Sequence, residues 1–531
     1  MGQSILQGWN EQWPTIRSTQ PLPTGEGVLD QGAFTTLEVD ELFDYVNHAR
    51  TVVGQAVLYR SLAQPLNDLD AIAAKQDAMR EIRDHPAVRD NIENIVAQAA
   101  ATERHLHLLL FGEFLGGFGT AREDHQIEGY GYKQYRRGIR LALNLVAAIQ
   151  HSGKPQSAYL QGVFDRIARF ADSKAYSLMV GPVYNSENGL QSKEERKHSF
   201  SPATIFRPTL FKPLLLALIT AAIWGVIQIF PTDLFQFSRD GLSVASVFFL
   251  PLILAYIPIV GGYDRDHCII PLRDIYRKSE TLGDLLDALG QLDELLAFIK
   301  YAENFGSDTI LPELHRNEHH AMQLTAAKNP VLGKQNPAYV ANDFTMDSER
   351  LVCITGPNSG GKTAFCKTVA QIQLLTQIGC PVPAQAARLT VADRVFYQAP
   401  QISHLDDGEG RFGTELKRTR DIFLASTANS LVVLDEMAEG TTFEEKMQSS
   451  IDVLDGFYRK GNSTVLITHN HQLVDVFVGK RIATPKQVEF ADDLPTFRLI
   501  AGISRVSHAD RVAKKIGFSK QDIDNYLAGS S

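Results

Sequence analysis

Most of the N-terminal half of the chain shows helical periodicity, with apolar residues recurring at steps of three and four. After an arm at residues 1–35, this spacing predicts amphipathic helices at 39–66, 69–83, 87–115, 136–151, 157–173 and 279–301. The residues around Asn67 and Asp68 can cap the second helix, and Pro86 lies beyond its end. These helices carry no catalytic constellation, so we expect an all-α core or lever region here.

Two apolar runs without charged residues interrupt this helical region, at 213–230 and 242–260. Each is close to the roughly 20 residues that a helix needs to cross a bilayer. Lysines and arginines are more numerous on the outer flanks than on the linker between the runs, which predicts cytoplasmic flanks. The pattern therefore predicts a transmembrane helical hairpin. The alternative is a buried helical hairpin that packs on a partner subunit.

From about residue 321 the pattern changes to short apolar strands alternating with helices. The run Leu351–Ile354 leads into GPNSGGKT, and a helical pattern begins at Ala364. The spacing G-x-x-x-x-G-K-T is that of a phosphate-binding P-loop, whose backbone N–H groups and helix N-terminus attract phosphate. The alternative is a chance glycine turn. The predicted nucleotide-binding residues are Gly356, Pro357, Asn358, Ser359, Gly360, Gly361, Lys362, Thr363 and Ala364.

Two later strands end in groups suited to phosphoryl chemistry. The strand in SLVVLDE ends at Asp435 and Glu436, and TVLITHN places His469 after another apolar strand. We expect Thr363 and Asp435 to hold Mg²⁺, and Lys362, Glu436 and His469 to act in ATP hydrolysis, with Glu436 polarising the attacking water. The alternatives are a solvated strand end for the carboxylates and a structural role for the histidine.

Composition narrows the class of protein. The 531 residues are 44% hydrophobic and 21% charged, with a net charge of −9 and a pI near 5.9. The chain can therefore bury sizeable cores, and no overall basic charge indicates nucleic-acid binding. The four cysteines form no C-x-x-C pair and suggest a reducing compartment. The predicted domains are an arm at 1–35, an outgoing lever at 36–207, a membrane hairpin at 208–262, a returning lever at 263–320 and an ATPase domain at 321–531.

Taken together, these segments resemble the MutS mismatch-repair ATPase family, a branch of the ABC-type ATPases. TGPNSGGKT resembles its P-loop, LVVLDEMAEGTT its carboxylate strand and dimer loop, and VLITHNHQL its histidine motif. GCPVPA, NPVL, YVANDFTM and RLIAGISRVSHADRVAKKIGF resemble its other segments, in the same order. Residues 53–79 are similar to the start of the family's helical core. The resemblance implies an ATP- and Mg²⁺-dependent ATPase that forms a homodimer.

The chain also departs from this family. Only about 35 residues precede the core, where the family has its mismatch-reading domain, and the apolar hairpin takes the place of the DNA clamp. The family's Ser-Thr-Phe signature appears as Gly410, Arg411 and Phe412, which puts the contact with the partner's nucleotide in doubt.

These departures led us to expect a membrane-anchored homodimer of the inner or cytoplasmic membrane, with its ATPase domain in the cytoplasm. In this hypothesis nucleotide-driven closure moves the lever helices and the hairpin, and DNA binding is doubtful. The alternatives are a DNA-binding ATPase of the mismatch-repair or branched-DNA type and an ABC-type transport ATPase. Three tyrosines among basic residues at 129–140 are the one local pattern that favours nucleic acid.

Overall fold

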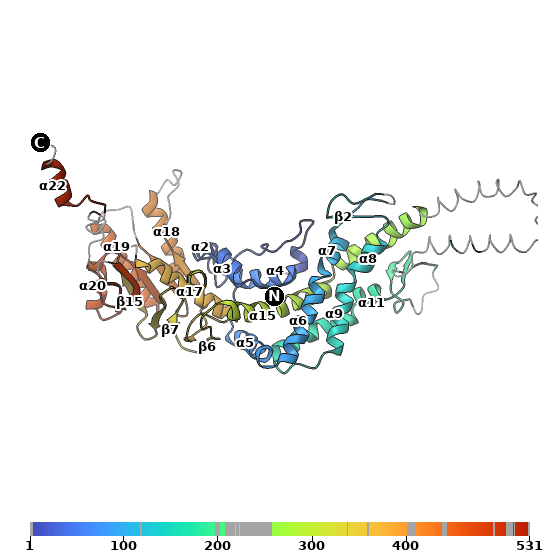
Figure 1. Cartoon of the computed structure of the whole chain (residues 1–531), viewed down its shortest axis with the longest axis horizontal. Helices are drawn as coiled ribbons and strands as arrows, with labels where there is room; N and C mark the ends of the chain where they lie inside the picture. The colour runs from blue at the N-terminus through green and yellow to red at the C-terminus, as the bar shows by residue number, and fades with distance from the viewer. Residues whose placement is uncertain are drawn as a thin grey trace, which may run out of the picture. The chain divides into compact units, whose positions relative to one another are not determined.

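The computed structural model describes residues 4–116, 119–196, 202–207, 218, 222, 258–336, 338–357, 360–400, 410–437, 443–491, 494–505, 513 and 516–528. These residues form two compact units, each assembled from three stretches of the chain. The first unit comprises Met1–Ser18, Ala49–Val57 and Glu81–Glu294, and the second comprises Thr19–His48, Leu58–Arg80 and Leu295–Ser531. Helices α4 (Val52–Ala63), α5 (Leu69–Asp84) and α15 (Glu280–Asn304) contribute residues to both units. Figure 1 labels the elements.

The first unit is mainly helical. Its helices are α1 (Ile5–Gly8), α6 (Pro86–Ala100), α7 (Glu103–Phe111), α8 (Tyr132–Gly138), α9 (Arg140–His151), α10 (Ala158–Arg169), η1 (Phe170–Asp172), α11 (Lys174–Val180), η3 (Arg265–Ile269) and α14 (Ile270–Arg277). It also contains two small sheets, which the all-α prediction did not include. One pairs β1 (Glu113–Phe114) with β2 (Gln126–Ile127), and the other has the order β4 (Gly189–Gln191), β3 (Val183–Ser186), β5 (Thr204–Phe206).

Buried carboxylates fix the start of α4 within the first unit. Asp293 accepts hydrogen bonds from the backbone N–H and the hydroxyl of Thr51, both at 2.7 Å. Glu103 accepts from the N–H of Val52 at 2.9 Å. A helix N-terminus leaves its first N–H groups without partners inside the helix, and carboxylates satisfy them well. Burial raises the pKa of Glu103 to about 7, so this cap titrates near neutral pH.

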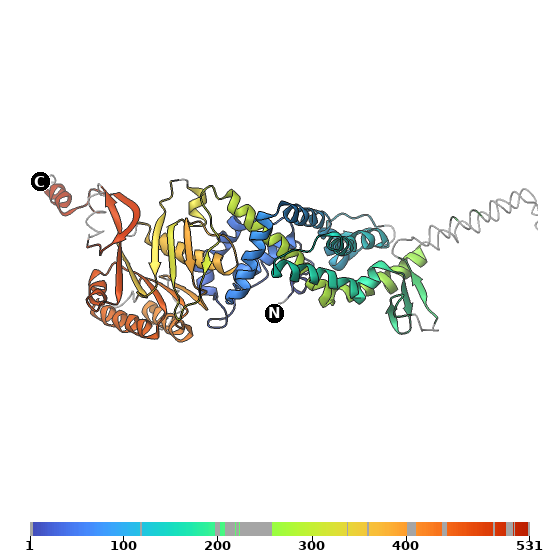
Figure 2. The same cartoon turned by 90° about the horizontal axis from the view of Figure 1, so that it is seen from below.

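The second unit is built around a six-stranded sheet with the order β11-β12-β13-β9-β14-β15. The strands are β9 (Leu351–Thr355), β11 (Val395–Gln398), β12 (Leu431–Asp435), β13 (Ser463–Ile467), β14 (Ala483–Ala491) and β15 (Leu494–Ala501). Neighbouring strands are parallel except for the antiparallel pair β14 and β15. In Figure 2 these strands, coloured from yellow to red, lie side by side. The predicted α/β organisation of this region is therefore confirmed.

The second unit contains further strands and helices. A second sheet has the order β6 (Glu313–Leu314), β10 (Ala386–Leu389), β7 (Met322–Ala327), β8 (Asn342–Met346). The helices are α2 (Gln31–Thr36), α3 (Val39–Val46), α16 (Leu332–Gln335), α17 (Lys362–Gln377), α18 (Gly410–Ala425), α19 (Phe443–Lys460), α20 (His471–Gly479) and α22 (Lys520–Ala528).

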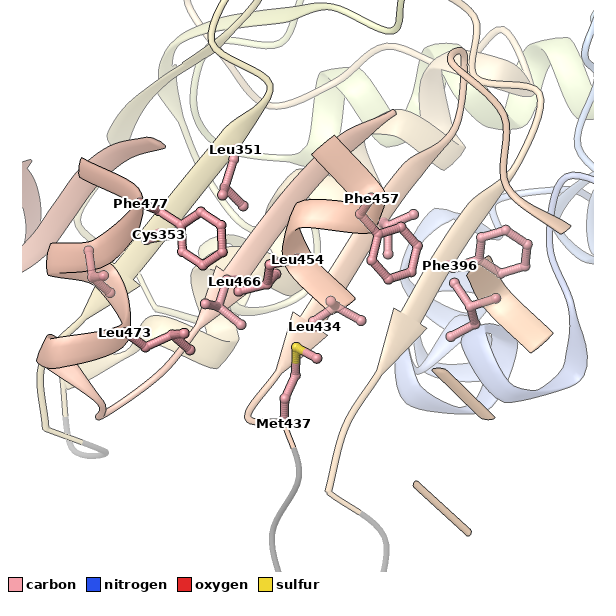
Figure 3. Packing of buried hydrophobic residues seen from close by; sticks show 13 residues of the cluster. Leu351, Cys353, Phe396, Leu434, Met437, Leu454, Phe457, Leu466, Leu473 and Phe477 are labelled. Carbon is pink, nitrogen blue, oxygen red and sulfur yellow. The ribbon is translucent and has the colours of Figure 1, made fainter. Parts of the chain in front are cut away.

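An apolar core lies between one face of the six-stranded sheet and helices α19 and α20. Figure 3 shows Leu351, Leu434 and Leu466 of the strands directed toward side chains of these two helices. The helices contribute Leu454, Phe457, Leu473 and Phe477, all of them buried. Strand side chains alternate between the two faces, so the neighbours of these leucines point to the opposite face, against which α17 packs.

No helix within the described ranges combines the length and the apolar character that a membrane span requires. The longest described helix, α15, has 25 residues but carries charged residues along its length, among them Asp284, Asp293 and Lys300. The predicted spans at 213–230 and 242–260 lie outside the described residues, except for 218, 222 and 258–260.

Candidate nucleotide-binding site

The strand order brings the predicted site residues to one edge of the sheet. Strand β9, which precedes the P-loop, pairs with β13, and β13 pairs with β12. All three strands are parallel, so their carboxyl ends meet at the same edge, where open α/β sheets bind ligands. Lys362 and Thr363 follow β9, Asp435 and Glu436 end or follow β12, and His469 follows β13.

The P-loop has the backbone conformation that its glycines predict. Gly356 has φ = 137° and Gly361, which precedes the first residue of α17, has φ = 79°. Side chains rarely adopt such φ values, whereas glycine adopts them easily. A Cβ atom added to Gly360 would also lie 3.0 Å from the Val488 side chain on β14. Pro357 is buried and Ala364 lies in the first turn of α17, whereas Asn358 and Ser359 lie outside the described residues.

Lys362 is directed back into this loop. Its side chain is almost fully buried, with 2% exposed, and its Nζ donates a hydrogen bond to the Gly356 carbonyl oxygen at 2.7 Å. Burial lowers the pKa of the Lys362 ammonium, and the nearby carboxylates Glu436 and Asp435 act in the opposite direction. A buried ammonium among inward-facing backbone groups provides the charge that a phosphate chain needs.

Thr363 and Asp435 form the predicted metal-binding pair. The Thr363 hydroxyl donates to Oδ2 of Asp435 at 2.9 Å, across 72 residues of sequence. Burial raises the pKa of Asp435, while the hydrogen bond from Thr363 lowers it. A hydroxyl and a carboxylate beside a phosphate-binding loop are the oxygen ligands that Mg²⁺ prefers. The residues present therefore fit a magnesium ion, which Thr363 and Asp435 would hold.

Glu436 and His469 are in direct contact. His469 Nε2 lies 2.9 Å from Glu436 Oε1, so the tautomer with a proton on Nε2 donates to the carboxylate. Glu436 has φ = 54°, in the left-handed region that non-glycine residues rarely occupy. Its backbone N–H is bonded to the Ile467 carbonyl at the end of β13. Such strain persists only where the surrounding structure enforces it, and it is frequent at functional sites.

Not every polar group near this edge belongs to a sequence motif. Tyr397 on β11 lies close enough to Asp435 for each group to affect the pKa of the other. Its position on the Asp435 face follows from strand alternation once β11 and β12 are paired, but no motif marks it. The signature residues Gly410, Arg411 and Phe412 begin α18, and their side chains lie outside the description.

Comparison with known protein families adds independent information. Residues 352–524 match the model of MutS domain V. A DNA mismatch repair protein MutS of Prochlorococcus marinus (strain MIT 9301) is 30% identical over 264 residues, covering 48% of this chain and 29% of the relative. A DNA mismatch repair protein msh3 of Aspergillus niger is 36% identical over 206 residues, covering 38% and 18%.

One relative aligns over a longer stretch. The DNA mismatch repair protein MutS of Myxococcus xanthus is 24% identical over 497 residues, which cover 85% of this chain and 54% of the relative. The chain thus spans about half or less of the length of these curated relatives.

The comparisons also correct the predicted membrane location. The relatives are DNA mismatch repair proteins, and no described helix has the length and apolar character of a span. The inner-membrane prediction is therefore wrong. Its basis was weak because the length of an apolar run does not distinguish a span from other apolar segments. The domain V match, together with the P-loop and carboxylate geometry, shows that residues 352–524 form a domain of the MutS domain V type.

Proposed function

We propose that this chain binds ATP with Mg²⁺ at the edge of the six-stranded sheet and hydrolyses it. The observation that carries the proposal is the 2.9 Å contact between Thr363 and Asp435 beside the buried Lys362. The match of residues 352–524 to MutS domain V supports the same activity.

Each residue has a distinct role in this proposal. Lys362 exchanges its bond to the Gly356 carbonyl for the β- and γ-phosphate oxygens, which offer a stronger, charged acceptor. The Thr363 hydroxyl and the Asp435 carboxylate hold the magnesium ion, which neutralises phosphate charge when bound. Glycine backbone N–H groups of the P-loop orient the phosphate chain, so that little reorganisation remains for the chemical step.

Glu436 orients and polarises the attacking water. A carboxylate does this well only if its own orientation is fixed, and here two constraints fix it. The backbone at Glu436 is held in the left-handed region by its bond to Ile467, and His469 Nε2 holds one carboxylate oxygen. In this proposal His469 acts through Glu436. Its position after β13, the strand next to β12, places its ring beside the Glu436 carboxylate.

Nucleotide binding and hydrolysis can be tested separately. Glu436→Gln keeps the shape of the side chain but removes its charge, so we expect ATP binding to persist while kcat falls by about 100-fold or more. Lys362→Ala removes the charge matched to the phosphates and should weaken ATP binding itself. Single-turnover hydrolysis and equilibrium binding of ATP measure the two effects.

A matched control is Glu444→Gln, which changes an exposed glutamate in the first turn of α19. It should leave both quantities at the wild-type level. Hydrolysis by Glu436→Gln at the wild-type rate would contradict the role given to Glu436.

We further propose that two copies of the chain close around two ATP molecules. The support is the match to MutS domain V and the predicted dimer loop after the carboxylate strand. Slow hydrolysis by Glu436→Gln should then trap the closed dimer. Light scattering should show an ATP-dependent shift from monomer mass toward twice that mass, and no shift for Lys362→Ala. A mass independent of ATP in both variants would contradict nucleotide-driven closure.

A second candidate function is DNA binding of the mismatch-repair type, which the names of the relatives favour over a membrane function. Because the chain spans only part of those relatives, it is a proposal that needs its own test. Binding of mismatched and fully paired duplexes should be measured at several salt concentrations. Phosphate contacts predict an affinity that falls steeply with salt, and mismatch recognition predicts tighter binding of the mismatched duplex. No binding at physiological salt would exclude this function.

A further inference from the structure

Strand pairing places Tyr397 beside the proposed magnesium-binding carboxylate. Strand β11 pairs in parallel with β12, with Tyr397 opposite Val433. Side chains two residues apart on a strand share a face, so Asp435 lies on the same face as Val433 and Tyr397. The diagonal distance between such residues on adjacent strands is within the reach of a tyrosine side chain. The ring of Tyr397 therefore extends toward the end of β12.

The Tyr397 hydroxyl has no other partner among the described residues. The residue is 1% exposed, and its Oη makes no hydrogen bond of standard geometry to a described residue. Its electrostatic neighbours are Cys366, Asp435 and Glu38. A buried hydroxyl without a partner is costly, so one is retained where it serves a purpose. Of these neighbours, Asp435 is the carboxylate whose pKa the Tyr397 hydroxyl lowers, so the two side chains lie near each other.

The chemistry of the two groups is complementary. A phenol keeps its proton at neutral pH, so the Tyr397 hydroxyl is a donor, and a carboxylate such as that of Asp435 is an acceptor. Asp435 already accepts from Thr363 through Oδ2. A second donor would fix the rotation of the carboxylate, because two bonds determine its plane where one does not. Donors behind a metal ligand commonly set its orientation and affinity in this way.

We propose that Tyr397 is a positioning residue that donates its hydroxyl proton to Asp435 and so orients this carboxylate toward the magnesium ion. The proposal rests on the proposed ATPase function, because Asp435 matters in this way only if it holds the metal. Tyr397 itself touches neither metal nor nucleotide. Tyr397 contributes by raising the affinity of the nucleotide-bound site for the metal ion.

The test is Tyr397→Phe in the full chain, with Mn²⁺ as the metal and a non-hydrolysable ATP analogue as the nucleotide. Free Mn²⁺ is measured by electron paramagnetic resonance, which does not depend on hydrolysis. We expect Mn²⁺ binding to weaken by about 10-fold, the lower end of the effect of losing a group behind a metal ligand. Affinity for the nucleotide in EDTA should not change, because Tyr397 does not contact the phosphates.

A matched control is Tyr301→Phe on α15. Tyr301 is also fully buried, and its hydroxyl also lacks a hydrogen-bond partner among the described residues. Its removal should leave Mn²⁺ affinity at the wild-type value. If both variants weaken Mn²⁺ binding equally, a general effect of buried hydroxyls explains the result and the proposal is wrong.

The Asp435→Asn background tests whether Tyr397 acts through Asp435. Adding Tyr397→Phe to Asp435→Asn should change Mn²⁺ affinity by less than 2-fold, because the group through which Tyr397 acts is already altered. A full additional 10-fold loss would overturn the proposal. Wild-type Mn²⁺ affinity in Tyr397→Phe would overturn it while leaving the ATPase function intact. Failure of the wild-type chain to bind Mn²⁺ with the nucleotide would contradict the proposed function as well.

Discussion

The two faces of the six-stranded sheet are both buried, but they are stabilised by different interactions. On one face, Val432 and Leu434 pack with Leu454 and Phe457 in an apolar cluster. Val433 and Asp435 lie on the other face, and helix α17 packs against their strand, β12. The first face is stabilised mainly by apolar packing, whereas the second also carries buried polar groups that need hydrogen-bond partners in defined directions. The proposed nucleotide site lies at the end of the second face.

Helix α17 shows how buried polar side chains on this face are paired. It is buried on nearly all sides, yet it carries three buried glutamines. Gln371 Nε2 donates to the Leu37 carbonyl at 2.8 Å, and Gln377 Nε2 donates to the carbonyls of Leu66 and Ala392 at 2.6 and 2.9 Å. Gln373 Oε1 accepts from His320 at 3.2 Å. Buried amides are tolerable only when they are paired, so this network fixes the position of the helix that follows the P-loop.

Phe457→Ala should have the largest effect on stability. It empties a fully buried position on the apolar face, and we expect the free energy of unfolding to fall by about 3–5 kcal/mol. ATP affinity at temperatures where the variant is folded should stay unchanged, because this face contributes no predicted ligand. Urea unfolding and equilibrium ATP binding check both points. Phe457→Leu, which leaves a smaller cavity, should cost clearly less, and an equal loss would contradict the packing explanation.

His320 should make the polar face sensitive to acid. Burial lowers the pKa of His320 from 6.5 to about 4, so the folded chain keeps the ring neutral while the unfolded chain protonates it below pH 6.5. The contribution of the neutral His320 to the free energy of unfolding is therefore fully present above pH 6.5. It is lost as the pH falls from 6.5 through 4. The maximum loss is about 3 kcal/mol, since one pKa unit corresponds to about 1.4 kcal/mol.

Urea unfolding between pH 4 and 8 measures this dependence. His320→Asn should show a flatter curve than the wild type over this window. His151→Asn changes an exposed histidine and should keep the wild-type curve. Parallel curves for the wild type and His320→Asn would show that another group causes the acid sensitivity.

Gln377→Leu should produce the smallest of these effects. It removes the donor to two buried carbonyl oxygens without changing the volume much, and leaving them without a partner should cost about 1–3 kcal/mol. Gln448→Leu, at an exposed position of α19 on the opposite face, should cost within about 0.5 kcal/mol. Thermal or urea unfolding compares the two. Equal costs of the two variants would mean that the hydrogen bonds of Gln377 do not stabilise this face of the sheet.

The nucleotide-binding edge could largely be predicted because its signals are local. The apolar runs ahead of Gly356, Asp435 and His469 appear in the structure as β9, β12 and β13, and the P-loop helix begins at Lys362. Parallel strands with carboxyl ends at one edge then bring the motifs together. The contact between Glu436 and His469 and the position of Tyr397 were not predictable in this way, because strand order and register decide them.

The sequence alone determined the P-loop, the strands on which the site residues lie and the resemblance to MutS proteins, since each depends on residues close together in the chain. Tertiary structure decided where helices end. The helix predicted at 39–66 is two helices, α3 and α4, and Thr51 at the start of α4 is bonded to Asp293, 242 residues away. Apolar periodicity continues across that break, so it gives no sign of it. A partner so distant in sequence becomes available only when the chain folds.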